Sequence, residues 1–274
     1  MFAGYSDVNS GIVQNLFTVS GSGTVLGARY AWYLPRIGDL DQKVTFGVDY
    51  RAYRNSVQIG GIGLVPDITV RPLSVAWSGS LRSAAGTTQL FAGYHQNLPG
   101  GNDGSDPDFK AARAQARAAY RILRYGVSHA HALPAGWQLR VALDGQETGD
   151  ALVSGEQYGL GGPDSVRGFQ IREVAGDRGV RSSLELYTPD LATHLGWRDV
   201  ALRIVGFYDM GSVSRNQLLP GESPGQSIAS TGIGLRVAYG RRASLRLDAA
   251  QVIESGGARE RNEQRVTGAL SVAF

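Results

Sequence analysis

Cysteine and long apolar runs are missing from this sequence. Its 274 residues include no cysteine and only 2 methionines. Without cysteine there is neither a disulfide framework nor a thiolate metal site, which fits a chain that faces the periplasm. Purely apolar runs are only a few residues long, far below the roughly 18 that a transmembrane helix requires. A chain like this can span a membrane only as a closed β-barrel, because closure satisfies every backbone amide in lipid.

Charge of one sign is not concentrated anywhere. The 27 basic and 24 acidic residues give a formal net charge of +3 and are spread along the chain. Because no basic block stands out, we expect no nucleic-acid partner. The first residues, MFAGYSD, lack a positively charged region followed by an apolar stretch, so they are not a signal peptide. An exported membrane protein needs such a peptide, so Met1 is expected to be an internal start.

A phosphate-binding loop is also missing, because the glycine-rich run 155–169 lacks the G-K-[S/T] of that motif. His129 and His131 share one strand face and could bind a metal or serve a barrel hydrolase, but this spacing is more typical of lumen or interface residues. We therefore expect no enzyme, no cofactor and no metal.

What the sequence does contain is a period of two, from about residue 22 onward. Leu202, Ile204 and Tyr208, for example, share one face of a predicted strand, and Arg203 and Asp209 lie on the other. We predict twelve strands: 2–7, 23–34, 42–57, 68–83, 87–98, 118–132, 137–148, 179–188, 199–214, 228–239, 243–254 and 265–274. Most exceed the 5–6 residues of soluble strands, and aromatic residues collect near their ends. The pattern favours an all-β, antiparallel transmembrane β-barrel over a water-soluble sandwich.

Two connections between predicted strands are long. The first, 99–117, ends in an alanine- and arginine-rich piece that could form a short helix. The second, 149–178, carries Arg167. If that loop folds into a barrel lumen, a desolvated guanidinium needs a carboxylate, and Asp209 is the natural inward-facing candidate. Two alternatives remain open: a flexible external loop, and an Asp209 that pairs with Arg203 or Arg236.

The chain ends on a strand-like run in which Gly268, Leu270, Val272 and Phe274 share one face. As structure alone, this run is a closing strand whose edge must pair with another strand.

Together these segments resemble the C-terminal barrel of two-partner secretion transporters, the hemolysin secretion/activation (ShlB/FhaC/HecB) family of the BamA-like superfamily. The resemblance covers nearly the whole chain. It rests on the runs NLPGGNDG, GEQYGLGG, SVRGF, LELYTP, FYDMG and GIGLR. The tetrad of Val166, Arg167, Gly168 and Phe169 is specific to the superfamily. The preceding run points to this branch; its residues include Gly155, Glu156, Gln157, Gly159, Gly161 and Gly162.

The resemblance implies a strand count. The family barrel has sixteen strands, and the glycine-rich loop joins the eleventh to the twelfth. Seven strands are predicted before the loop here and five after it, so the chain is expected to match family strands five to sixteen. Residues 1–274 would then be one partial barrel domain. The first four strands, the two periplasmic POTRA domains, the plug helix and the signal peptide are expected to be missing.

The resemblance also implies roles. Loop 149–178 would fold into the lumen, where Arg167 would pair with Asp209 beside Phe207. The terminal strand ending at Phe274 would match the signal read by the barrel-assembly machinery. A full-length relative passes one unfolded exoprotein, such as a hemolysin or adhesin, across the bacterial outer membrane without ATP. The implied partners are that exoprotein, outer-membrane lipid and the assembly machinery.

Three other functions stay open. A BamA-like assembly factor would share the V-R-G-F tetrad, although the lead-in run argues against it. A short closed pore would need strand 2–7 to pair with 265–274. An outer-membrane hydrolase would need a Ser–His pair within hydrogen-bond reach.

Overall fold

A computed structural model describes residues 1–13, 17–55, 58–59, 62–63, 66–193, 195–197 and 199–273. Within this part of the chain, twelve long strands form one antiparallel sheet. They are β1 (Phe2–Val13), β2 (Phe17–Tyr33), β3 (Leu40–Asn55), β7 (Pro72–Ser83), β8 (Gly86–Asn97), β9 (Arg121–Ala132), β10 (Gln138–Glu147), β13 (Arg178–Tyr187), β14 (Val200–Ser214), β15 (Gly225–Tyr239), β16 (Ala243–Glu254) and β17 (Gln264–Val272). The prediction of an antiparallel barrel fold with about twelve strands is confirmed.

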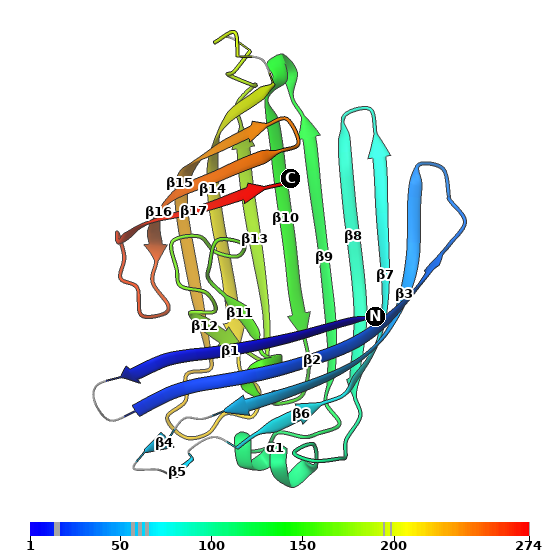
Figure 1. Ribbon diagram of the computed structural model, residues 1–274, viewed down its shortest axis with the longest axis vertical. Helices are drawn as coiled ribbons and strands as arrows, with labels where there is room; N and C mark the ends of the chain where they lie inside the picture. The colour runs from blue at the N-terminus through cyan, green and yellow to red at the C-terminus, as the bar shows by residue number, and fades with distance from the viewer. Residues whose placement is uncertain are drawn as a thin grey trace.

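Each long strand pairs with its neighbours along the chain. The order runs from β17 through β13, β10 and β3 to β2 and β1. Figure 1 shows the sheet curling around the segment that contains the short strands β11 (Tyr158–Leu160) and β12 (Val174–Gly176). Sequential pairing of this kind needs only local hairpin connections, so the long loop between β10 and β13 is free to lie on the concave side.

The two faces of the sheet differ in chemistry. Residues directly opposite each other in a ladder point to the same face, so the register groups the side chains strand by strand. One face is lined by exposed apolar side chains, such as Leu26, Trp32, Phe46, Val75, Leu123, Val141, Leu184, Ile204, Ile233 and Leu270. The other carries the charges. None of the helices in the described ranges is long and apolar enough to cross a membrane.

The structure corrects three predicted strand limits. The strand predicted over 2–7 continues to Val13, and its partner β2 begins at Phe17 rather than at residue 23. Both segments are polar and rich in glycine, so their propensity is weak, but the pairing supplies the ladder. The single strand predicted over 68–83 is two, β6 (Ile68–Val70) and β7, both paired with β3. The ladder breaks at Arg71-Pro72, because proline has no amide donor.

The two ends of the sheet carry different connections. Short turns at 34–39, 84–85, 133–137 and 240–242, together with the connection 188–199, form what we call the short-turn end. The connections 98–120, 148–177, 215–224 and 255–263 form the long-loop end. Barrels of the bacterial outer membrane have this asymmetry, with short turns toward the periplasm and longer loops outside.

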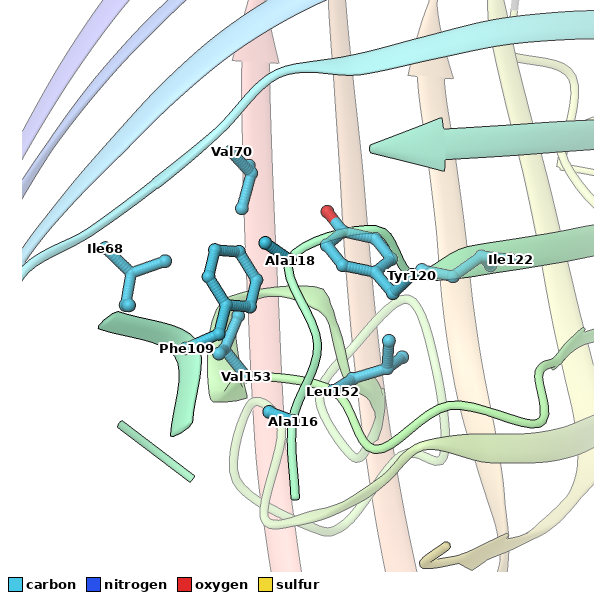
Figure 2. Close-up of a cluster of buried hydrophobic side chains, with 9 residues drawn as sticks. All are labelled: Ile68, Val70, Phe109, Ala116, Ala118, Tyr120, Ile122, Leu152 and Val153. Atoms are coloured by element: carbon cyan, nitrogen blue, oxygen red, sulfur yellow. The ribbon is translucent and has the colours of Figure 1, made fainter. Parts of the chain in front are cut away.

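A hydrophobic cluster forms at the long-loop end, around the helix α1 (Asp106–Ala112). Figure 2 shows its members: Ile68, Val70, Phe109, Ala116, Ala118, Tyr120, Ile122, Leu152 and Val153. The rings of Phe109 and Tyr120 lie 6.0 Å apart between centroids. Hydrogen bonds from the Ser105 hydroxyl and amide lower the pKa of Asp108, and this carboxylate caps the helix. A short helix is therefore present in the first long connection, but it begins at Asp106, before the alanine- and arginine-rich piece, and ends within that piece at Ala112.

Candidate functional site

The loop between β10 and β13 folds back into the concave side of the sheet. β11 and β12 pair to make a small hairpin, with register Tyr158↔Gly176 to Leu160↔Val174. Gly161 and Gly162 follow β11 with φ of +106° and +105°. The chain therefore reverses sharply after β11 and carries the V-R-G-F tetrad onto β14, β15 and β16.

Arg167 lies at the tip of this loop and is only 2% exposed. Its Nε and Nη2 atoms donate to Oδ2 and Oδ1 of Asp209, at 2.6 and 2.7 Å. The backbone amide of Arg167 also donates to Asp209 Oδ2, at 3.2 Å. The pair is bidentate, a geometry that arginine's planar fork provides and lysine cannot. The structure thus brings together the two residues that the sequence suggested as partners.

Further groups surround the same guanidinium. Arg167 Nη1 donates to Glu185 Oε1 at 2.8 Å and lies 3.8 Å from Asp248 Oδ1. The guanidinium carbon is 3.6 Å from the centre of the Phe207 ring, so a cation–π contact covers one face. Ser183 donates its hydroxyl to Asp209 at 2.6 Å. Sequence reasoning named Asp209 and Phe207 but missed Glu185 and Asp248, although both lie on inward positions of their strands.

Apolar packing holds the residues beside Arg167. Val166 and Phe169 are fully buried in a second cluster, whose other members are Leu160, Val174, Val213, Ile228 and Val252. Between them Gly168 has φ of +92°, and a Cβ there would lie 3.2 Å from the Ala250 side chain. The tip of the loop therefore has its own small core against the barrel wall, and the charge is enclosed by it.

The lead-in to the loop makes a second anchor on a distant strand. Glu156 is buried, and its Oε1 accepts hydrogen bonds from Arg51 Nη1 at 3.0 Å and from the Tyr53 hydroxyl at 2.9 Å. Gly155 lies against the Tyr53 ring, where a side chain would collide with it. The loop therefore bridges from β10 to β3, four strands away in the sheet order.

The rest of the lead-in is held within the loop. Gln157 donates to Asp177 at 3.4 Å, and Gly159 lies against the Arg172 side chain. Asp177 is fully buried and forms a bidentate ion pair with Arg113, just after α1. The two long connections are thereby fastened to each other at the long-loop end.

A third anchor precedes the tetrad. Arg246 on β16 donates from Nη1 to the Asp164 carboxylate at 2.8 Å and from Nη2 to the Pro163 carbonyl at 2.5 Å. Arg181 on β13 donates to the Asp164 carbonyl and to Asp144. The turn 163–164 is therefore held by arginines of the inner wall.

The other singled-out residues lie elsewhere. Leu270 and Val272 on β17 point outward and are exposed; Gly268 lies on the same face, and Phe274 is outside the described residues. His129 and His131 also lie on the outer face near the short-turn end, with ring centroids 5.6 Å apart. In the described ranges no group of three metal-ligating side chains occurs. His129 contacts the Thr88 hydroxyl, at 2.8 Å.

Comparison with known proteins places this geometry in a family. The model for the haemolysin secretion/activation proteins ShlB/FhaC/HecB matches residues 2–237. The chain belongs to this family. No curated protein matches the sequence.

Solved structures show the same fold. CdiB from Escherichia coli superposes with a TM-score of 0.83 at 20% identity, covering 99% of this chain and 49% of that one. CdiB from Acinetobacter baumannii gives 0.69 at 14% identity, covering 97% and 45%. BamA from Haemophilus ducreyi lacking POTRA domains 1–3 gives 0.58 at 18% identity, covering 93% and 55%. The chain spans about half the length of these relatives.

Proposed function

We propose that this chain forms the barrel of an outer-membrane pore that secretes, and activates, a partner exoprotein of the hemolysin or adhesin type by two-partner secretion. The observation that carries the proposal is the loop tip, where Arg167 is buried against Asp209 inside a barrel fold of the haemolysin secretion/activation family. In this proposal residues 1–274 are barrel throughout, and the loop is a movable part of the lumen.

The outer face supports a place in the bacterial outer membrane. Apolar side chains point away from the loop on strands from β2 to β17, as lipid-facing strands require. Exposed aromatic residues near the short-turn end, such as Tyr30, Trp32, Trp137 and Tyr239, suit the interfacial girdle of such a barrel. Lipid would be the partner of this face, and Gly268, Leu270, Val272 and Phe274 would form the signal for the assembly machinery.

The inner wall supports transport of an extended chain. Charged and hydroxyl side chains can hydrogen-bond the exposed backbone of an unfolded polypeptide, which an apolar lumen would leave unsatisfied. Movement needs no catalytic group and no ATP in this scheme, because folding of the exoprotein outside supplies the driving force. The loop fills part of the lumen, so its anchors must loosen as the polypeptide passes.

Replacement of Arg167 tests the role of the loop. In cells that express the protein from its own gene with its exoprotein, Arg167→Ala should abolish secretion while the barrel still reaches the outer membrane. Ile171→Ala is the matched control, because this residue of the same loop is exposed. Normal secretion by Arg167→Ala, at normal protein level, would show that the loop has no role in export.

An assembly factor is the second candidate, since the BamA structure shares the fold. Depletion of the protein separates the two. Loss of one exoprotein from the medium supports secretion, whereas a general loss of other outer-membrane barrels supports assembly.

A further inference from the structure

Three arginines lie side by side on the inner wall. Arg203 on β14 pairs in register with Arg236 on β15, which pairs in turn with Arg246 on β16. We call these three residues the arginine row. Directly opposite side chains in a ladder lie about 5 Å apart, and like charges at that spacing are destabilising. A row of three cations therefore requires anions among its members.

The protein itself supplies part of that charge. Asp248 lies between two members of the row, 2.7 Å from Arg236 Nη2 and 2.7 Å from Arg246 Nε. Arg203 has a weaker partner, because its Nη1 donates to the neutral Gln138 amide at 3.3 Å. In the part of the chain that the structure describes, no carboxylate lies within 4.0 Å of the Arg203 guanidinium. Asp190, in the connection 188–199, interacts with Arg203 only at longer range. Arg203 can therefore still bind a carboxylate in direct contact.

A peptide segment already occupies one end of the row. Arg246 binds the Asp164 carboxylate and the Pro163 carbonyl of the loop. The Asp164 side chain is otherwise 88% exposed, so this contact is made at a solvent-facing surface. An arginine of the row therefore binds an acidic turn through both a side-chain and a main-chain oxygen.

Open space adjoins the row on both sides. A cavity of about 430 Å³ is bordered by Arg236, Arg246 and the turn 163–165. A second cavity, of about 480 Å³, is bordered by Arg203, Arg236 and Arg246 and continues toward β17. Both have the size of ordinary ligand sites. An extended segment can therefore reach all three arginines from the lumen.

We propose that the arginine row binds acidic segments of the polypeptide in transit, through aspartate or glutamate carboxylates and main-chain carbonyls. The turn 163–164 is the resident ligand, and an incoming acidic segment takes its place on Arg246 while Arg203 takes a further carboxylate. This inference rests on the proposed secretion function and adds the chemistry of the segment that is bound. Exchange at Arg246 would also loosen one anchor of the loop.

Peptide binding to the protein in detergent micelles tests the row. The probe is a short fluorescein-labelled glycine–serine peptide that carries aspartates, and its control has asparagines in the same positions. Fluorescence anisotropy should show the aspartate peptide binding at least about tenfold more tightly, with affinity falling as salt rises. Arg203→Gln should weaken that binding by about 3- to 10-fold, which corresponds to the net contribution of a single hydrogen bond.

Two further variants make the test specific. Asp164→Asn removes the carboxylate of the resident ligand and should strengthen binding of the aspartate peptide, while every arginine stays in place. Arg215→Gln is the control, because this arginine lies in the connection 215–224 at the long-loop end and pairs with Glu222. Its affinity for the aspartate peptide should equal that of the unaltered protein. Folding of each variant is checked by its migration on a gel without heating.

Three results would overturn the proposal. Equal binding of the aspartate and asparagine peptides, or no effect of Arg203→Gln in a folded protein, would overturn the proposal. Competition by free acetate at the same carboxylate concentration would assign the row to small anions instead, which also overturns it. If Arg203→Gln does not fold, the result for Asp164→Asn decides. If the protein binds the acidic peptide but secretes no exoprotein, the proposed function is refuted, whereas the binding of acidic segments by the arginine row stands.

Discussion

Arg167 and Asp209 lie 42 residues apart in the sequence, yet the guanidinium of one meets both carboxylate oxygens of the other, at 2.6 and 2.7 Å. The contact crosses from the loop tip to the inner wall. The carboxylates of Glu185 and Asp248 lie beside the same guanidinium, so one cation is shared by three acidic side chains. Removing the cation and removing one anion are therefore very different changes.

The first prediction follows from this asymmetry. Arg167→Ala leaves three carboxylates around an empty space and should release the loop tip, because breaking a buried ion pair from one side costs about 3–5 kcal/mol. Asp209→Asn leaves Arg167 with Glu185 and Asp248 and should release it much less. Trypsin cleavage after Arg172, the exposed loop arginine that both variants keep, measures release in folded protein. Equal cleavage of the two variants would contradict a shared cation.

The second prediction concerns the backbone of the tip. Gly168→Ala should weaken the docking of the loop by about 1–2 kcal/mol, because φ there is +92° and an L-residue is strained in that region. The new methyl group would also crowd Ala250. Gly149→Ala is the matched control, since that glycine has an ordinary φ and open space around it. Secretion of the partner and trypsin cleavage of the loop are the readouts, and identical behaviour of the two variants would rule out strain at the tip.

The sequence predicted the faces of the strands better than it predicted the contacts made by the long connections. Alternation placed Arg203 and Asp209 together on the face of β14 that turns inward, because the period of two depends on local geometry alone. It did not show that Glu156 reaches Arg51, more than a hundred residues away, since the path of an irregular loop has no period. Nor did it show the cluster around Phe109, whose members come from several connections.

The sequence also could not show which charges pair with each other on the inner wall, because that depends on the register between strands. Glu185 and Asp248 lie on inward positions of their strands, but which inward charges meet depends on how the strands are offset and where the loop lands. The family resemblance identified Asp209 because its motif carries that contact. That motif did not indicate that Asp248 would lie beside Arg167, nor that the members of the arginine row would lie side by side.

The third prediction concerns the cluster at the long-loop end. Phe109→Ala should destabilise the connection 98–120 by about 3–5 kcal/mol, the usual cost of removing a buried aromatic ring. Lys110→Ala, at the next position of α1, changes an exposed residue and should have little effect. Trypsin cleavage after Arg117, which is exposed on the same connection, reports the loosening. If Phe109→Ala protein resists trypsin as well as the control does, the cluster does not hold this connection.

The fourth prediction tests which face meets lipid. Val141 and Ala142 are neighbours on β10; Val141 lies on the apolar outer face, whereas Ala142 borders the cavity at the loop tip. A lysine on the lipid face costs about 2–4 kcal/mol near the middle of the bilayer, whereas one in the lumen is solvated. Val141→Lys should therefore reduce the amount of folded protein in the outer membrane, and Ala142→Lys should leave it nearly unchanged. Membrane fractionation with gels run without heating measures both. If Ala142→Lys reduces the amount of folded protein more than Val141→Lys does, the apolar face does not contact lipid. That result would also refute the proposed location in the outer membrane.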